Sequence, residues 1–195
     1  MIKPFEFYFD FASPYSFIAH KQIIKIENEY SIKIIYMPVL LGGLLKSAGM
    51  KANVDIPIKG RYMIKDCKLC AEKHNIQFKF NHYFPIFTLN LMRCVLVAQK
   101  NSLEKKFIDK IFDSIWKDDL NLNDTPTVEK ILKSVNINPK SFLNEIINQE
   151  IKDELKKRTE DAFTKGIFGV PSFLINNKLF WGQDRLDFVL EEAKK

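Results

Sequence analysis

The first 38 residues constrain the fold most strongly, because they predict a strand, a helix and a second strand in that order. Residues 5–11 alternate with Phe at every second position, which is typical of a strand. Apolar residues then recur at helical spacing over 15–26, and residues 32–37 predict another strand that ends at Pro38. A helix of this length can carry the chain across a sheet, so we expect the two strands to pair in parallel.

The end of the chain predicts two more strands and a helix. Residues 172–176 and 178–181 are typical of a hairpin, with its turn at Asn176-Asn177. A last helical pattern follows, and Asp184 stands where it can cap that helix.

Between these parts, helical patterns follow one another from residue 60 to residue 166. Their predicted start signals are, in chain order, Asn101 or Ser102, Thr125-Pro126 and Asn138-Pro139. Ahead of them, Leu41-Gly-Gly-Leu44 lacks the Gly-Lys-Ser/Thr of a phosphate-binding loop, and we interpret it as a turn.

The element order is therefore β-α-β, a long helical stretch, and β-β-α. It predicts an α/β chain in which a thioredoxin-like domain carries a large all-helical insertion. We expect residues 1–40 and 167–195 to form the thioredoxin-like domain and residues 60–166 the inserted subdomain. The crevice between the two is where we expect the function.

Composition argues against several classes of protein. The net charge is +6, but only four of the 30 Lys and Arg residues are Arg, and basic and acidic residues are interleaved, which disfavours nucleic-acid binding. No apolar run approaches the roughly 18 residues that span a bilayer. The N-terminus shows no signal-peptide pattern, and three Cys residues do not form a secreted disulfide framework. We expect a soluble cytoplasmic protein without nucleic-acid or membrane partners.

The sharpest functional signal is the segment from Asp10 to Ser16, at the junction of the first predicted strand and helix. In thioredoxin-like folds this turn carries a reactive Cys-x-x-Cys, because a helix N-terminus stabilises a thiolate. Here both cysteine positions, Ser13 and Ser16, are serine. A serine hydroxyl cannot exchange disulfides, but it can donate a hydrogen bond to the thiolate of another molecule. The alternative is that Ser13 only caps the helix.

A second signal, Cys67-Lys-Leu-Cys70, competes with the first, since Cys-x-x-Cys can indicate redox chemistry or zinc. It lies within a helical pattern rather than after a strand, and a zinc site needs two further ligands. We interpret both cysteines as catalytically idle and expect no metal. A Ser-His-Asp triad is also disfavoured, because no Gly-x-Ser-x-Gly elbow is present and His20 follows Ser13 by two helical turns.

Two further segments are weaker signals when taken alone. The Pro of Val170-Pro171 suits a strand entry, whereas a cis bond there would turn the backbone of Val170 outward, where an extended peptide can pair with it. At the start of the last helix, free N–H groups can hold a carboxylate and Asp184 an ammonium group.

Four segments together resemble a known family: residues 7–19, 57–63, 168–173 and 180–186. They are similar to the 2-hydroxychromene-2-carboxylate isomerases and the kappa-class glutathione transferases, within the broader family named for the disulfide oxidoreductase DsbA. The similarity extends from about residue 5 to the last helix. The resemblance implies a thioredoxin-like domain with a helical insertion, and glutathione as the cofactor.

The resemblance also implies roles for individual residues. Ser13 matches the catalytic serine that holds the glutathione sulfur as a thiolate. Val170 matches the residue whose backbone pairs with the cysteinyl part. Gln183 and Asp184 match the positions that hold the γ-glutamyl end.

The glycine end of glutathione is where this chain departs from the family. Lys59 matches a lysine near the glycine carboxylate. Many members have Asn after a Gly in the preceding loop, whereas this chain has Gly49-Met50, and Asn53 is the candidate substitute.

From this resemblance we expect a glutathione-dependent isomerase that acts on an unsaturated aromatic 2-oxo acid by reversible thiolate addition. Two alternatives stay open: a kappa-class-like glutathione transferase, and a non-catalytic binding protein of the DsbA family. The expected partner is a small aromatic acid, and a homodimer is left open.

Overall fold

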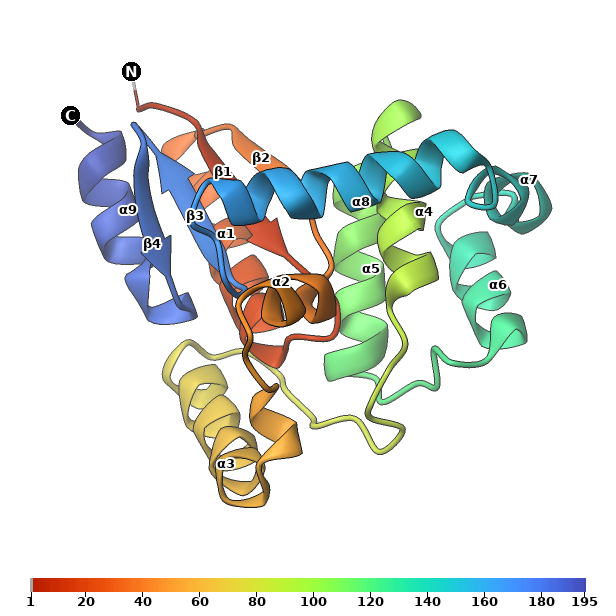
Figure 1. Ribbon diagram of the computed structural model, residues 1–195, viewed down its shortest axis with the longest axis horizontal. Coiled ribbons are helices and arrows are strands. Elements are labelled where there is room, and N and C mark those ends of the chain that lie inside the picture. The colour runs from red at the N-terminus through yellow and green to blue at the C-terminus, as the bar shows by residue number, and fades with distance from the viewer. Residues whose placement is uncertain (1) are drawn as a thin grey trace.

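The computed structural model describes residues 2–195, and its centre is a mixed sheet of four strands (Figure 1). The strands are β1 (Phe5–Phe9), β2 (Ile34–Pro38), β3 (Ser172–Ile175) and β4 (Lys178–Trp181). They lie in the order β2-β1-β3-β4. β1 pairs in parallel with β2 and antiparallel with β3, and β3 pairs antiparallel with β4. The predicted parallel pair and the predicted hairpin are confirmed.

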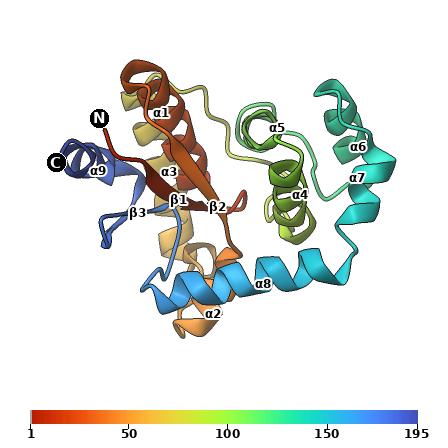
Figure 2. The ribbon, with the colours of Figure 1, turned by 90° about the horizontal axis from the view of Figure 1, so that it is seen from above.

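Within residues 2–195, nine α-helices surround the sheet. They are α1 (Pro14–Tyr30), α2 (Leu41–Ser47), α3 (Pro57–Lys73), α4 (Leu89–Lys100), α5 (Glu104–Trp116), α6 (Thr125–Ser134), α7 (Pro139–Glu145), α8 (Gln149–Thr164) and α9 (Leu186–Ala193), with the short 3-10 helices η1 (Asn53–Asp55) and η2 (Gln183–Arg185). Figure 2 shows α1 and α8 on opposite sides of the sheet, with α9 at one end of the molecule and α6 and α7 at the other. None of these helices combines the length and apolarity that crossing a membrane requires.

Helices pack against both faces of the sheet. Phe5, Phe7 and Phe9 point into the larger core, which they share with residues of α1, α4 and α5. Tyr8 points the other way and is only 1% exposed, because α2 and α8 cover that part of the opposite face. Tyr8 therefore lies on the face opposite the Phe residues, as the alternation of the sequence indicates, and the second layer of helices buries it there.

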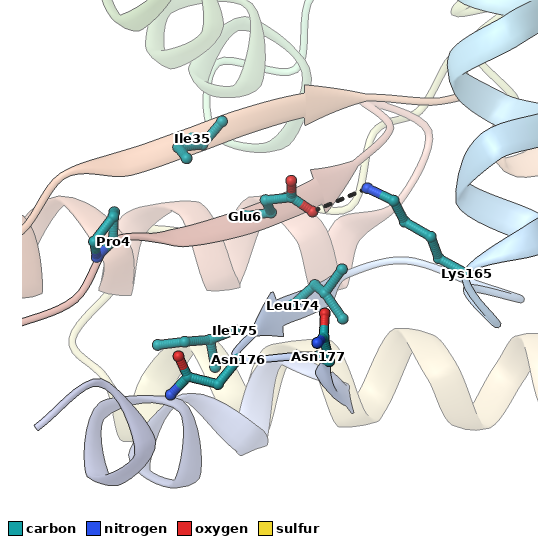
Figure 3. A pocket seen from close by; sticks show the side chains of 8 residues that line it. All are labelled: Pro4, Glu6, Ile35, Lys165, Leu174, Ile175, Asn176 and Asn177. Carbon is teal, nitrogen blue, oxygen red and sulfur yellow. Dashed lines mark ion pairs between the residues drawn. The ribbon is translucent and has the colours of Figure 1, made fainter. Parts of the chain in front are cut away.

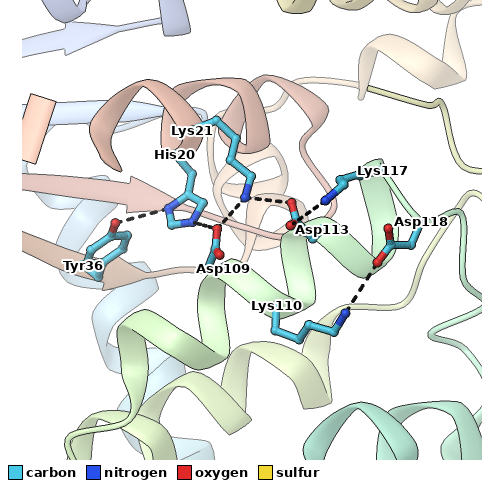
Figure 4. A network of polar contacts seen from close by, with 8 residues as sticks. All are labelled: His20, Lys21, Tyr36, Asp109, Lys110, Asp113, Lys117 and Asp118. Atoms are coloured by element: carbon cyan, nitrogen blue, oxygen red, sulfur yellow. Dashed lines mark hydrogen bonds and ion pairs between the residues drawn. The ribbon is translucent and has the colours of Figure 1, made fainter. Parts of the chain in front are cut away.

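A buried polar network joins α1 to α5 (Figure 4). The Nε2 atom of His20 lies 3.1 Å from a carboxylate oxygen of Asp109, and its Nδ1 atom lies 3.2 Å from the hydroxyl of Tyr36. Burial lowers the pKa of His20 despite the nearby carboxylate. Both nitrogens of this histidine are therefore engaged in holding the helical layer to the sheet, which is consistent with a structural role.

The starts of the middle helices differ in detail from the predicted ones. Asn138 caps α7 as expected, accepting a hydrogen bond from the Ser141 amide. The cap of α6 is Asp124, one residue before the predicted Thr125. Ser102 does not start α5, because it has a positive φ of 57° just after the end of α4.

The segment Leu41-Gly-Gly-Leu44 was expected to be a turn, and that expectation is wrong. It forms the first turn of α2. Leu40, at the cap position, offers no side-chain acceptor, so the local sequence carries no start signal. The amide of Leu40 instead donates to the hydroxyl of Thr159 on α8, 3.0 Å away. A contact between distant parts of the chain therefore supports this helix.

Candidate active site

Ser13 lies at the N-terminus of α1, where the sequence predicted it. Its Oγ accepts a hydrogen bond from the Ser16 amide at 3.1 Å, which makes Ser13 the N-cap of the helix. The same hydroxyl donates to the carbonyl oxygen of Val170 at 3.3 Å. Ser13 therefore caps the helix and also faces the segment before β3, and the two interpretations of this residue do not exclude each other.

The Val170–Pro171 peptide bond is cis. Val170 and Ser13 are 157 residues apart in the sequence, and the hydrogen bond between them joins the two parts of the thioredoxin-like fold. Both residues are buried, with exposed fractions of 7% and 4%. Ser13 lines one cavity, and Val170 lines that cavity and a second one.

The first cavity has a volume of about 400 Å³ and a largely apolar wall. Its apolar lining includes Leu41, Leu45, Met50, Val54, Ile56, Met63, Phe84 and Phe168. Ser13, Asn53 and Lys59 supply polar groups to the same cavity. This arrangement suits a ligand with an apolar body that approaches Ser13.

The second cavity has a volume of about 650 Å³ and a more polar wall. Its lining includes Gln22, Asp66, Cys70, Lys73, Gln183, Asp184 and Arg185. Tyr15, Asn53, Val170 and Trp181 line both cavities, so the two adjoin. All six residues that the sequence nominated, namely Ser13, Asn53, Lys59, Val170, Gln183 and Asp184, line one cavity or both.

A third hollow, of about 480 Å³, lies over β1 and β3 and is bordered by Glu6, Lys165 and Leu174 (Figure 3). The Lys165 ammonium group lies 3.5 Å from the Glu6 carboxylate. None of the six nominated residues lines this hollow, so it is separate from the candidate site.

Gln183 is held in place by neighbours that the sequence did not predict. Its side-chain oxygen accepts from Gln22 on α1 at 3.0 Å, and its Nε2 donates to Cys70 Sγ on α3 at 3.2 Å. The amide is only 8% exposed. Two helices, α1 and α3, therefore fix its orientation at the edge of the polar cavity.

Asp184 was expected to cap the last helix, and this expectation is wrong. Gly182, with a φ of 115°, leads the chain into η2, so Asp184 lies inside that short helix rather than before it. Its side chain makes an ion pair with Arg185 at 2.9 Å and is 54% exposed. The carboxylate is thus accessible from solvent at the polar cavity.

Sequence reasoning missed the pair formed by Tyr15 and Asp66. The Tyr15 hydroxyl donates to the Asp66 carboxylate at 2.7 Å. Burial raises the pKa of Tyr15, and the nearby Cys67 and Asp66 add to that shift. Because the pair joins α1 to α3 across 51 residues, no local pattern could have revealed it.

The two cysteines of Cys67-Lys-Leu-Cys70 lie in the interior of α3 and are free thiols. Burial raises the pKa of the Cys67 thiol, and burial together with Asp66 raises that of Cys70. Both shifts favour protonated thiols, which are weak nucleophiles. The position of Cys70 on the polar cavity, beside Gln183, was not anticipated.

The fold and the site define a thioredoxin-like protein with a helical insertion and a serine where such folds often hold a reactive cysteine. Residues 5–194 match the sequence profile of the DSBA-like thioredoxin domain. The chain belongs to this DsbA-like family.

Individual relatives narrow the comparison. The 2-hydroxychromene-2-carboxylate isomerase of Sphingobium xenophagum is 25% identical over 191 residues, which cover 97% of each chain. Glutathione S-transferase kappa 1 of Rattus norvegicus is 24% identical over 199 residues, covering 94% of this chain and 88% of that protein. A solved structure of a 2-hydroxychromene-2-carboxylate isomerase has a TM-score of 0.89 at 21% identity, over 98% of this chain and 94% of that one. The predicted fold class and the predicted resemblance are both confirmed.

Proposed function

We propose that this protein is a glutathione-dependent enzyme that isomerises an unsaturated aromatic 2-oxo acid. One observation carries the proposal: the Ser13 hydroxyl, at the start of α1, lines the apolar cavity and is hydrogen-bonded to Val170, which lines both the apolar and the polar cavity. The polar cavity suits a charged peptide, and the apolar cavity suits an aromatic acid. The names of the two groups of relatives agree with an enzyme of this kind.

In this proposal glutathione lies across both cavities. Its cysteinyl backbone pairs with Val170, and its γ-glutamyl ammonium group meets the Asp184 carboxylate. Gln183 holds the γ-glutamyl carboxylate. At the other end, Lys59 and Asn53 hold the glycine carboxylate. The signs of the charges match at both ends, which supports this direction of binding.

Bound glutathione would supply a nucleophilic thiolate for reversible addition to the unsaturated carbon of the acid. A free thiol has a pKa of about 8.5, so the protein must favour its ionised form. The N-terminus of α1 favours a negative charge at Ser13 through its N–H groups and dipole. The Ser13 hydroxyl can rotate from the Val170 carbonyl to the sulfur while its oxygen still caps α1. The chain thus needs no cysteine of its own.

The alternative is a kappa-class-like transferase, in which the glutathione adduct is released instead of being reversed. The similarity to the rat kappa enzyme, at nearly the same identity as to the isomerase, favours keeping this alternative. A non-catalytic DsbA-family binding protein is the third candidate.

We also propose that the protein is located in the cytoplasm, where thiols stay reduced.

One experiment separates these three functions. The protein is mixed with glutathione and benzylidenepyruvate, an unsaturated aromatic 2-oxo acid, and both the acid and the free thiol are followed. An isomerase converts the cis and trans forms of the acid while the free thiol stays constant, whereas a transferase consumes one thiol for each acid. If the protein binds glutathione but changes neither, the binding protein is the correct function. If it does not bind glutathione, the proposal is wrong.

A further inference from the structure

Asp10 is a buried carboxylate next to the candidate site that the proposed chemistry does not use. It follows β1 directly and is 2% exposed. Its Oδ1 accepts from the Ala12 amide at 3.0 Å and from the Thr88 hydroxyl at 2.6 Å, and its Oδ2 accepts from the Leu41 amide at 2.8 Å. All three partners can donate to an ionised carboxylate, although burial raises the pKa of this group.

The three partners of Asp10 belong to three different parts of the site. Ala12 lies in the turn that leads to Ser13, and the amide of Ser13 itself donates to the Asp10 carbonyl at 3.1 Å. Leu41 is the first residue of α2, and Thr88 is the cap position of α4. One side chain therefore joins the turn of Ser13 to the starts of two helices.

These helix starts depend on Asp10 because neither has a side-chain cap of its own. Leu40, at the cap position of α2, has no acceptor in its side chain, and Asp10 accepts the hydrogen bond of the next amide. Thr88, at the cap position of α4, makes no side-chain cap bond, and its hydroxyl donates to Asp10. The contact between Thr88 and Asp10 thus links the start of α4 to the turn of Ser13.

Residues at and near these two helix starts line the apolar cavity. Leu41 and Leu45 of α2 line it, and so does Phe84, four residues before Thr88. Asp10 and Thr88 do not line the cavity themselves. They can affect a ligand there only through the position of these walls.

We propose that Asp10, together with Thr88, is a positioning residue that fixes the walls of the apolar cavity, and hence the aromatic acid, relative to Ser13. This inference rests on the proposed function, because it takes the apolar cavity as the place of the acid. Glutathione is held mainly by residues on other elements, so Asp10 should affect the two ligands unequally.

Thr88 offers a matched pair of variants. Thr88→Val removes the hydroxyl donor at nearly constant size, and Thr88→Ser keeps it. Asp10→Asn provides a second test, because it keeps one acceptor oxygen and turns the other into an NH2 group that cannot accept, so that one side of the network loses its acceptor. Thermal unfolding checks that each variant is folded. If Asp10→Asn does not fold, the comparison of Thr88→Val with Thr88→Ser alone tests the proposal.

Binding of the two ligands is measured separately. Benzylidenepyruvate is titrated without glutathione, and quenching of Trp181 fluorescence at the cavity wall reports its binding. Glutathione is titrated by calorimetry. For Thr88→Val we expect the Kd of the acid to rise about fivefold or more and that of glutathione to change by less than about twofold, with Thr88→Ser close to the wild type.

Equal acid affinity in the wild type, Thr88→Val and Thr88→Ser overturns the positioning role, and so does an equal loss of affinity for both ligands. Either result leaves the proposed function standing if the wild type binds glutathione. Failure of the wild type to bind glutathione refutes the proposed function before any variant is made. The two failures are therefore distinguishable.

Discussion

The substitution Asp184→Asn separates ligand binding from stability, because it removes a charge at almost constant size. Within residues 2–195, Asp184 caps no helix, and the ion pair that it makes is with Arg185; both of these side chains are about half exposed. Pairs of this kind contribute at most about 1 kcal/mol to stability. We therefore expect the free energy of unfolding to fall by less than about 0.5 kcal/mol.

The effect of Asp184→Asn on the binding free energy of glutathione should be larger than its effect on stability. A hydrogen bond between an ammonium group and a carboxylate contributes about 1.5–3 kcal/mol when it is well shielded. The Asp184 side chain is 54% exposed, so the contribution should lie near or below the lower limit. A loss of about 1–1.4 kcal/mol corresponds to a rise of about five- to tenfold in the Kd of glutathione.

Calorimetric titration of glutathione and thermal unfolding of the free protein measure the two quantities. Asp187→Asn is the matched control, since it removes the same charge from the lining of the same cavity. We expect this control to change the Kd by less than about twofold. An unchanged Kd for Asp184→Asn together with a clear loss of stability would refute the reasoning, because Asp184 would then be structural and the γ-glutamyl group would lie elsewhere.

Two further predictions concern groups outside the reaction. Replacing both Cys67 and Cys70 by Ser should leave glutathione-dependent turnover within about threefold and cost about 1 kcal/mol of stability; loss of turnover in a folded variant would show that a thiol takes part. On α9, hydrogen bonds from Lys178 and Asn176 lower the pKa of Glu192 from 4.5 to about 2. Because the folded state has the lower pKa, this stabilisation is complete above about pH 4.5 and is lost as the pH falls towards 2. Glu192→Gln should flatten that part of the pH profile of thermal unfolding, and an equally steep fall in the variant would contradict the assignment.

Local patterns were sufficient to predict the elements that hold Ser13. Alternating Phe residues defined β1, and the pair Ser13-Pro14 combines a preferred cap with a residue preferred in the first turn of a helix. The turn Asn176-Asn177 has positive φ at both residues, as a tight hairpin requires. In each case the determining contacts lie within a few residues of the chain.

The features that the sequence did not predict depend on contacts between distant residues. Asp10 and Thr159 supply the acceptors at the start of α2, from 31 and 119 residues away. Cys70 meets Gln183 across 113 residues. Asp184 failed as a cap for another reason, since the conformation of Gly182 shifted the start of α9 by inserting η2. A single sequence carries no local signal for the contacts between distant residues.

The central claim is that Ser13 stabilises the glutathione thiolate, and the thiolate absorbance of the bound complex tests it most directly. In the wild-type complex the thiol pKa should lie about one unit or more below its free value of about 8.5, and Ser13→Ala should raise it again. Ser16→Ala is the control, because the Ser16 hydroxyl is buried near the same helix start and has no hydrogen-bond partner within residues 2–195. It should titrate like the wild type. Identical titrations of the wild type and Ser13→Ala, with glutathione bound to both, would contradict the account.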